Sequence, residues 1–273
     1  MRLQIASDLH LETRPKQTFE TILTPSAPCL ALLGDIAPLD HPNLRRFLEW
    51  CSERWETILY VPGKSECFTE PKDSSQAPIV RQGLPPRQSE PYQDIQTSVD
   101  TLKMICSTYE NIHVLYRDSF YSEDGVLILG CPFWSFDPYQ PKYIQKLHRA
   151  DLTWIQSMTK SYTNPILVLS HFGPVSWVQY EHELIDPRTS PIFTETELLL
   201  RNPITTWAFG HCHTYIEYSK VWGSANGIPQ TVLLVCNGMG PRPTKETAHL
   251  PISDYQSNAV LGIDPSLYLP NAV

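Results

Sequence analysis

The stretch LQIASDLH, residues 3–10, joins a short apolar run to two side chains of the kinds that bind metals. Leu3 to Ala6 has the composition of a buried strand, and Asp8 and His10 follow directly after it. Residues two apart in extended backbone point to the same side, so this pair could hold one metal centre. The same arrangement, a buried strand followed by polar side chains, recurs along the chain.

Short apolar runs with strand character alternate with polar or glycine-rich turns. They are Leu3 to Ala6, Cys29 to Leu33, Ile58 to Val61, Val126 to Leu129, Ile166 to Leu169, Trp207 to Phe209 and Thr231 to Cys236. Stretches with apolar residues at helical spacing are Asn43 to Trp55, Asp94 to Tyr109, Pro141 to Tyr162 and Thr194 to Arg201. Strands that alternate with helices predict a layered α/β architecture.

Polar residues follow five of these predicted strands at the point where each strand ends. After the first strand with Asp8 and His10, they are Asp35, Gly63 to Glu66, His171, and the pair His211 and His213. Loops beyond the carboxyl ends of strands converge at one edge of an open α/β sheet. Carboxylate oxygens mixed with imidazole nitrogens suit Zn, Fe or Mn rather than Ca. The sequence therefore predicts a metal site at this edge.

The bulk composition predicts one globular domain over residues 1–273, with an irregular insertion at about 70–93. Hydrophobic residues make up 41% of the 273 residues and charged residues 18%, enough apolar material for a sizeable core. The insertion is rich in Pro, Ser and Gln and poor in large aliphatic residues.

Charge and cysteine usage narrow the expected partners and location. A net charge of −8 opposes binding to nucleic acids and to anionic membranes, because both depend on Lys and Arg neutralising phosphates. Neither a secretory signal nor an apolar run of membrane-spanning length is visible. Seven scattered cysteines without a CxxC pair are typical of a reduced, cytoplasmic protein.

Each of these motifs is common by itself, but their order along the chain is specific. SDLH (Ser7 to His10), LGD (Leu33 to Asp35), SH (Ser170, His171) and GHCH (Gly210 to His213) resemble the calcineurin-like metallophosphoesterase family from residue 5 to 240. The block LYVPGKSE, ending at Glu66, matches that family's GNHE or GNHD motif in Gly63 and Glu66. HLETRPKQTF near the start and HRADLTWI from His148 resemble the small fungal-type members.

The resemblance implies a four-layer α/β/β/α sandwich and a metal-dependent hydrolase that acts on a small phosphoester through a metal-bound hydroxide. It implies one or two divalent or trivalent ions of Mn, Fe or Zn. The implied ligands are Asp8, His10 and His213 for one ion, His171 and His211 for the second, and Asp35 as the bridge between them.

The GKSE block departs from the family at two positions. Lys64 stands where the family has an Asn ligand to the second metal, and Ser65 where it has the His that protonates the leaving group. An ammonium group cannot ligate a cation, so Lys64 either turns to solvent and weakens that site or replaces the ion as a point charge. The Ser65 hydroxyl is too weak an acid to replace an imidazolium. His182 is either an exposed loop residue or the missing acid.

Two other functions remain open from the sequence alone. The metal could polarise a carbonyl, so that the chain acts on a small metabolite without phosphate. Alternatively, the chain could be a non-catalytic scaffold that keeps the fold and binds partners through its surface.

Overall fold

A computed structural model describes residues 1–68, 92–135, 142–160, 162–175, 196–225, 228–243 and 253–264. His182 and most of the insertion expected at 70–93 lie outside these ranges. Among the described helices, none has both the length and the apolar character needed to cross a bilayer.

The first sheet has the strand order β11-β1-β2-β3-β4. Four of its strands, β1 (Arg2–Ala6), β2 (Cys29–Leu33), β3 (Thr57–Val61) and β4 (Ile112–Val114), are parallel, and β11 (Val260–Gly262) pairs antiparallel with β1. Parallel strands bury both faces, which explains why β2 and β3 are almost entirely apolar. All the carboxyl ends of the parallel strands therefore lie at one edge.

The second sheet has the order β5-β6-β7-β8-β10-β9. Its strands are β5 (Asp118–Tyr121), β6 (Leu127–Cys131), β7 (Ile166–Ser170), β8 (Ile204–Phe209), β9 (Tyr215–Ala225) and β10 (Ile228–Asn237). Strands β6, β7, β8 and β10 are parallel, whereas β5 and β9 pair antiparallel at the two edges. All seven strands predicted from the sequence are present in the two sheets.

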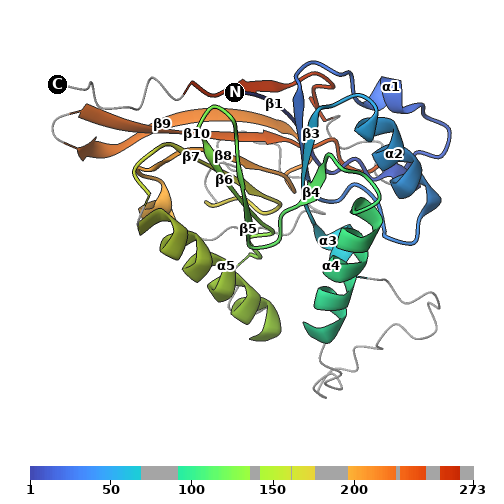
Figure 1. Cartoon of the computed structure of the whole chain (residues 1–273), viewed down its shortest axis with the longest axis horizontal. Coiled ribbons are helices and arrows are strands. Elements are labelled where there is room, and N and C mark those ends of the chain that lie inside the picture. The colour runs from blue at the N-terminus through green and yellow to red at the C-terminus, as the bar shows by residue number, and fades with distance from the viewer. Residues whose placement is uncertain are drawn as a thin grey trace.

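Helices cover the outer faces of both sheets (Figure 1). The helices of the described residues are α1 (Phe19–Ile22), α2 (Pro42–Ser52), α3 (Lys64–Cys67), α4 (Tyr92–Cys106) and α5 (Lys142–Lys160), with short 3-10 turns at Leu11–Thr13 and Glu197–Leu199. The helix predicted at Thr194 to Arg201 is wrong in its described part, where only the second of these turns forms.

Three apolar layers hold the elements together and confirm the four-layer α/β/β/α sandwich. One core lies between the first sheet and helices α2 and α4, with Phe47 and Leu102 among its buried residues. A second joins α5, through Ile155, to the second sheet. The third contains residues of both sheets, such as Leu33 of β2 and Leu169 of β7, so the sheets pack face to face.

Backbone contacts bring the carboxyl ends of the two sheets together. The Ser7 N–H, just after β1, donates to the Asn237 carbonyl at the end of β10, and the Met239 N–H donates back to the Ser7 carbonyl. The Asp8 N–H donates to the Gly34 carbonyl at 2.9 Å. The loops that carry the predicted ligands thus start from one shared edge.

Candidate metal centre

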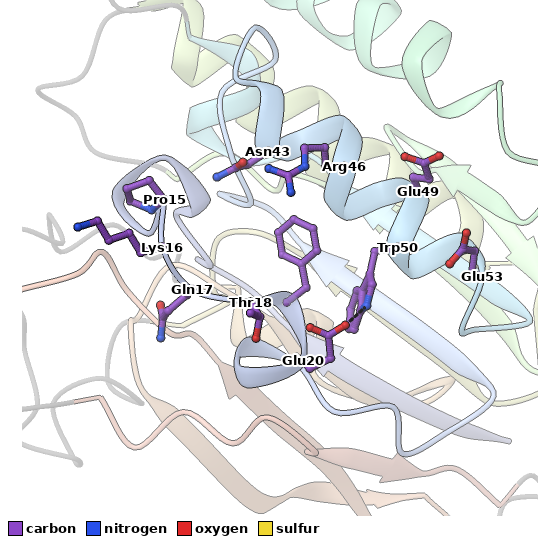
Figure 2. Close-up of a pocket in the computed structure, with 11 residues that line it drawn as sticks. Pro15, Lys16, Gln17, Thr18, Glu20, Asn43, Arg46, Glu49, Trp50 and Glu53 are labelled. Carbon is purple, nitrogen blue, oxygen red and sulfur yellow. Dashed lines mark hydrogen bonds between the residues drawn. The ribbon is translucent and has the colours of Figure 1, made fainter.

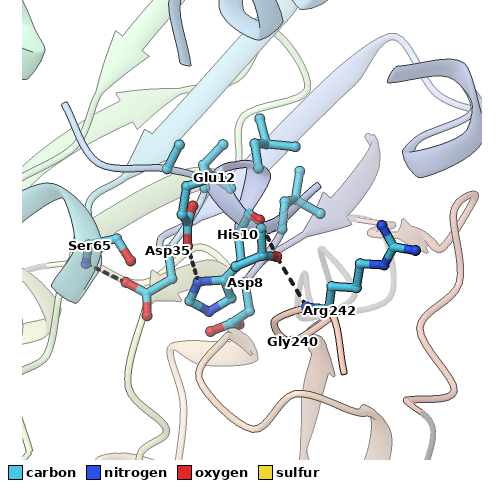
Figure 3. Close-up of polar contacts among 12 residues, drawn as sticks. Asp8, His10, Glu12, Asp35, Ser65, Gly240 and Arg242 are labelled. Carbon is cyan, nitrogen blue, oxygen red and sulfur yellow. Dashed lines mark hydrogen bonds and ion pairs between the residues drawn. The ribbon is translucent and has the colours of Figure 1, made fainter. Parts of the chain in front are cut away.

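The structure brings all six predicted ligand residues together in two overlapping groups. Ligand atoms within each group lie within 4.8 Å of one another. The groups are Asp8, His10 and His213, and Asp8, Asp35, His171 and His211. The side chains of His10 and Asp8 come from one loop and that of Asp35 from the next (Figure 3).

The ligand residues lie in loops just after strands, and most of them adopt left-handed backbone conformations that turn the chain sharply. Five of the six have positive φ: 54° at Asp8, 45° at His10, 53° at Asp35, 69° at His211 and 52° at His213. Non-glycine residues in this region cost about 1–3 kcal/mol each and cluster at functional sites, where the surrounding structure holds them. Asp and His tolerate this region better than branched residues do.

Glycines allow the loops after β2 and β3 to approach closely. Gly34 has φ 81°, and a Cβ there would lie 2.6 Å from the Gly63 backbone and 2.7 Å from the His171 ring. Any larger residue at either glycine would separate the loop of Asp35 from that of Glu66. The LGD and GKSE blocks therefore need their glycines to form one site.

Asp8 is fully buried and is the residue that the two groups share. Its Oδ2 accepts the His211 N–H at 2.8 Å, and its Oδ1 lies 3.4 Å from His213 Nε2 without a hydrogen-bond partner among the described residues. Asp35 contributes to one group: its Oδ1 accepts the Ser65 N–H at 2.7 Å, and its Oδ2 lies 3.6 Å from His171 Nε2. The resemblance assigned the bridging role to Asp35, whereas in the structure Asp8 is common to both groups.

Two histidines are oriented through Nδ1, which leaves Nε2 directed at the centre. His171 Nδ1 lies 2.9 Å from the Leu33 carbonyl, which can only accept, so Nδ1 carries the proton. His10 Nδ1 lies 3.0 Å from Glu12 Oε1. Nε2 of both rings is buried and has no hydrogen-bond partner in the described chain. This is the arrangement by which carboxylates and carbonyls orient histidine ligands toward a metal.

Charge and burial set the protonation of the cluster. Burial alone would raise the pKa of Asp8, but the adjacent His213 ring and the nearby charges of His171 and His10 outweigh it and hold that pKa well below its usual value. Burial and the nearby charge of His171 lower the pKa of His211 to about 3, so its ring is neutral near pH 7. Neither ring nitrogen of His211 has a hydrogen-bond partner among the described residues.

The unpaired atoms fit a metal ion. Buried polar atoms normally have partners, and leaving one unpaired costs about 1–3 kcal/mol. Here five such atoms gather in one place: Asp8 Oδ1, His10 Nε2, His171 Nε2 and both ring nitrogens of His211. Anionic oxygens and neutral imidazole nitrogens are a donor set for Zn, Fe or Mn. The cluster is therefore compatible with metal binding.

The GKSE block contacts the rest of the site through Ser65 and Glu66, whereas Lys64 turns to solvent, the first of the two alternatives considered for it. Lys64 is exposed at the start of α3, and Ser65 meets Asp35 through its backbone N–H. Sequence reasoning assigned no role to Glu12 or Glu66. Glu12 orients His10, and Glu66, which is 1% exposed, accepts hydrogen bonds from the loop of Asp35. The spacing of Glu12, two residues after His10, was the signal available for the first.

A separate surface hollow of about 460 Å³ lies between α1 and α2 (Figure 2). Phe19 and Trp50 line it together with charged residues such as Arg46 and Glu20, and Glu20 accepts a hydrogen bond from the Trp50 indole. None of its lining residues belongs to either metal-compatible group. The hollow and the Asp/His cluster are distinct features.

Comparisons with known proteins give distant likenesses. No family model matches the chain. "Uncharacterized protein L509" of Acanthamoeba polyphaga mimivirus is 23% identical over 220 residues, covering 67% of this chain and 71% of that protein.

Three solved structures are similar over most of this chain. TT1561 of Thermus thermophilus has a TM-score of 0.44 at 14% identity, covering 87% of this chain and 88% of its own. A dimetal phosphatase from Danio rerio has a TM-score of 0.43 at 12% identity, covering 89% of each chain. A putative 5'-nucleotidase from Staphylococcus aureus has a TM-score of 0.41 at 13% identity, covering 97% of this chain and 56% of its own. All three TM-scores are below 0.5. The fold is therefore assigned from the strand order and packing of this chain itself.

Proposed function

We propose that this chain is a metal-dependent hydrolase of the calcineurin-like metallophosphoesterase type that acts on a small phosphoester. The observation that supports this most is the buried Asp/His cluster with unpaired lone pairs at the shared edge of two sheets. Clusters of this kind are costly to keep without a ligand, so their presence favours a bound cation. The ordered SDLH, LGD, SH and GHCH motifs supply every member of the cluster.

The proposed ligands divide between two positions. Asp8, His10 and His213 would hold the first ion, and Asp35, His171 and His211 the second, with Asp8 shared by the two groups. Such ions supply Lewis acidity toward phosphoryl oxygens and make water nucleophilic at neutral pH. Glu12 would keep His10 in the tautomer with Nε2 free, and the Leu33 carbonyl would do the same for His171. Because Lys64 is exposed and supplies no ligand, the second position is proposed to be the weaker one.

Leaving-group protonation is the step for which this chain has the least machinery. Ser65 occupies the family's acid position, and His182 lies outside the described residues. General acid catalysis contributes a factor of roughly 10² to 10⁴. The proposed substrates are therefore aryl or acyl phosphates, whose leaving groups need little protonation. All seven cysteines are free thiols, which supports a reducing, cytoplasmic setting.

Metal analysis and turnover on one preparation test the proposal. The purified protein should hold about one tightly bound ion per chain under limiting Mn, Fe or Zn, and should hydrolyse an aryl phosphate only when loaded. Metal without phosphatase activity would favour the non-phosphate enzyme. Absence of metal binding, with a stable protein partner, would favour the scaffold and refute the proposal. Two ions of equal affinity would contradict the weaker second position.

A further inference from the structure

A buried carboxylate outside the ligand set links two of the loops that form the metal centre. Glu66, in α3, is 1% exposed and accepts five hydrogen bonds. Its Oε2 accepts the Asp35 N–H at 3.0 Å and the Gly63 N–H at 2.8 Å. Its Oε1 accepts the Ile36 N–H at 2.8 Å, the Ala37 N–H at 3.4 Å and the Tyr60 hydroxyl at 2.8 Å.

The donors come from the chain on either side of Asp35 and from β3 with its loop. Three successive backbone N–H groups, those of residues 35 to 37, point at this one side chain. The contact is reciprocal, because the Ser65 N–H donates to Asp35 Oδ1 at 2.7 Å. Asp35 is therefore held at both its backbone, which has φ 53°, and its carboxylate. Both contacts come from the GKSE block.

A charged group in this place needs a reason beyond packing. No cation pairs with Glu66 among the described residues, and a second carboxylate, that of Asp35, lies close enough to act on its charge. Burying a carboxylate without a cation is costly unless several hydrogen bonds compensate it. An apolar side chain could fill the space but could not hold three consecutive N–H groups in one direction.

We propose that Glu66 is a positioning residue for the metal centre, which fixes the left-handed turn at Asp35 and so aims that carboxylate at the ions. The inference rests on the proposed function, because it requires that the Asp/His cluster binds metal. Glu66 does not itself belong to either ligand group. It acts through the backbone of a residue that does.

Glu66→Gln is the matched perturbation, since it keeps the shape and removes one acceptor oxygen. If the Gln NH₂ group takes the place of Oε2, it faces the N–H groups of Asp35 and Gly63. If the NH₂ group takes the place of Oε1, it faces the N–H groups of Ile36 and Ala37. Either orientation loses at least two hydrogen bonds and opposes donors with donors. The turn at Asp35 should relax in both cases.

The effect is measured as the Mn²⁺ affinity of protein that a chelator has first made metal-free. Calorimetry or equilibrium dialysis monitors the Mn²⁺ titration. Loss of an outer-shell partner typically weakens metal affinity by 10–100-fold, and we expect a loss in this range for Glu66→Gln. Gln4→Glu is the control: Gln4 is fully buried in β1 and makes four hydrogen bonds away from the ligand groups. The control should destabilise the fold in denaturant while Mn²⁺ affinity stays within about threefold of the parent.

The outcomes separate this inference from the proposed function. A parent that binds no Mn²⁺ would refute both. A parent that binds Mn²⁺ while Glu66→Gln binds it about equally well would refute the positioning role alone, as would an equal loss in Gln4→Glu. If Glu66→Gln does not fold, Tyr60→Phe decides: it removes one donor to the carboxylate, and affinity should fall by about threefold to tenfold. Unchanged affinity in Tyr60→Phe would then overturn the proposal.

Discussion

Replacing His211 by Phe should make the metal-free protein more stable and abolish part of its response to metal. His211 is 4% exposed, and neither ring nitrogen has a hydrogen-bond partner in the described chain. Its ring already packs on Phe172, with the centroids 4.6 Å apart. An aromatic ring without nitrogens therefore suits the surroundings better than imidazole does, unless a cation is present.

The expected gain can be worked out from the unpaired atoms. Each unsatisfied buried nitrogen costs about 1–3 kcal/mol. Part of the gain is lost because a Phe at φ 69° is less favourable than a His, although Phe133 adopts φ 54° elsewhere in the protein. A net gain of about 1 kcal/mol corresponds to a rise in Tm of roughly 2–4 °C for a chain of this size.

His148→Phe is the matched control, since His148 is also buried but is hydrogen-bonded. Its Nδ1 pairs with the Trp134 carbonyl, so the Phe variant leaves that carbonyl unpaired. Its Tm should fall by about 2 °C or more, opposite in sign to His211→Phe.

Thermal unfolding with chelator and with added Mn²⁺ provides the assay for all three proteins. At a concentration about 100 times its Kd, metal should stabilise the parent and His148→Phe by about 2.7 kcal/mol, and His211→Phe by clearly less. In the presence of chelator, the Tm of His211→Phe could instead fall as far as that of His148→Phe. The two nitrogens of His211 would then have hydrogen-bond partners in the metal-free protein. These nitrogens would then give no support to a cation site at His211.

Three further outcomes follow from the described contacts. Lys64→Asn combined with Ser65→His restores the family pattern and should add a second ion and turnover of alkyl phosphates; no change in ion content or rates would show that these side chains do not face the site. Asp35→Asn should lower metal content more than His171→Ala, because it removes charge as well as coordination, and parental metal content in Asp35→Asn would contradict this. Burial raises the pKa of Asp151 from 3.8 to about 6, so the folded state holds its proton more tightly than the unfolded state. The stabilisation is complete below pH 3.8 and lost as the pH rises past about 6. The parent's stability relative to Asp151→Asn should therefore drop by about 2 kcal/mol between roughly pH 4.5 and 7.5 in denaturant titrations, whereas a constant difference would argue against it.

The elements that could be predicted from sequence are those whose burial leaves a regular pattern of apolar residues. Strands such as β2 and β7 are short, continuous apolar runs because parallel strands contact other layers on each side. Helix α2 has buried residues at helical spacing because only one of its faces meets the sheet. The edge strand β5 was missed since its residues are mostly exposed, and its hydrogen bonds to β6 leave no trace in composition.

The sequence by itself determined which residue types meet at the centre, because Asp8, His10, His211 and His213 follow strands whose carboxyl ends lie at one edge. The extended backbone assumed for the two pairs was wrong, since all four residues have positive φ, and His211 and His213 fall in different groups. The sequence could not determine how the six residues divide into groups, since that depends on the packing of the two sheets. Only the tertiary structure brought Asp8 into both groups, and it alone showed Glu66 beneath Asp35, thirty-one residues away in sequence. Hydrogen bonds between distant loops depend on distances of a few ångströms, and no local pattern in the sequence encodes such distances.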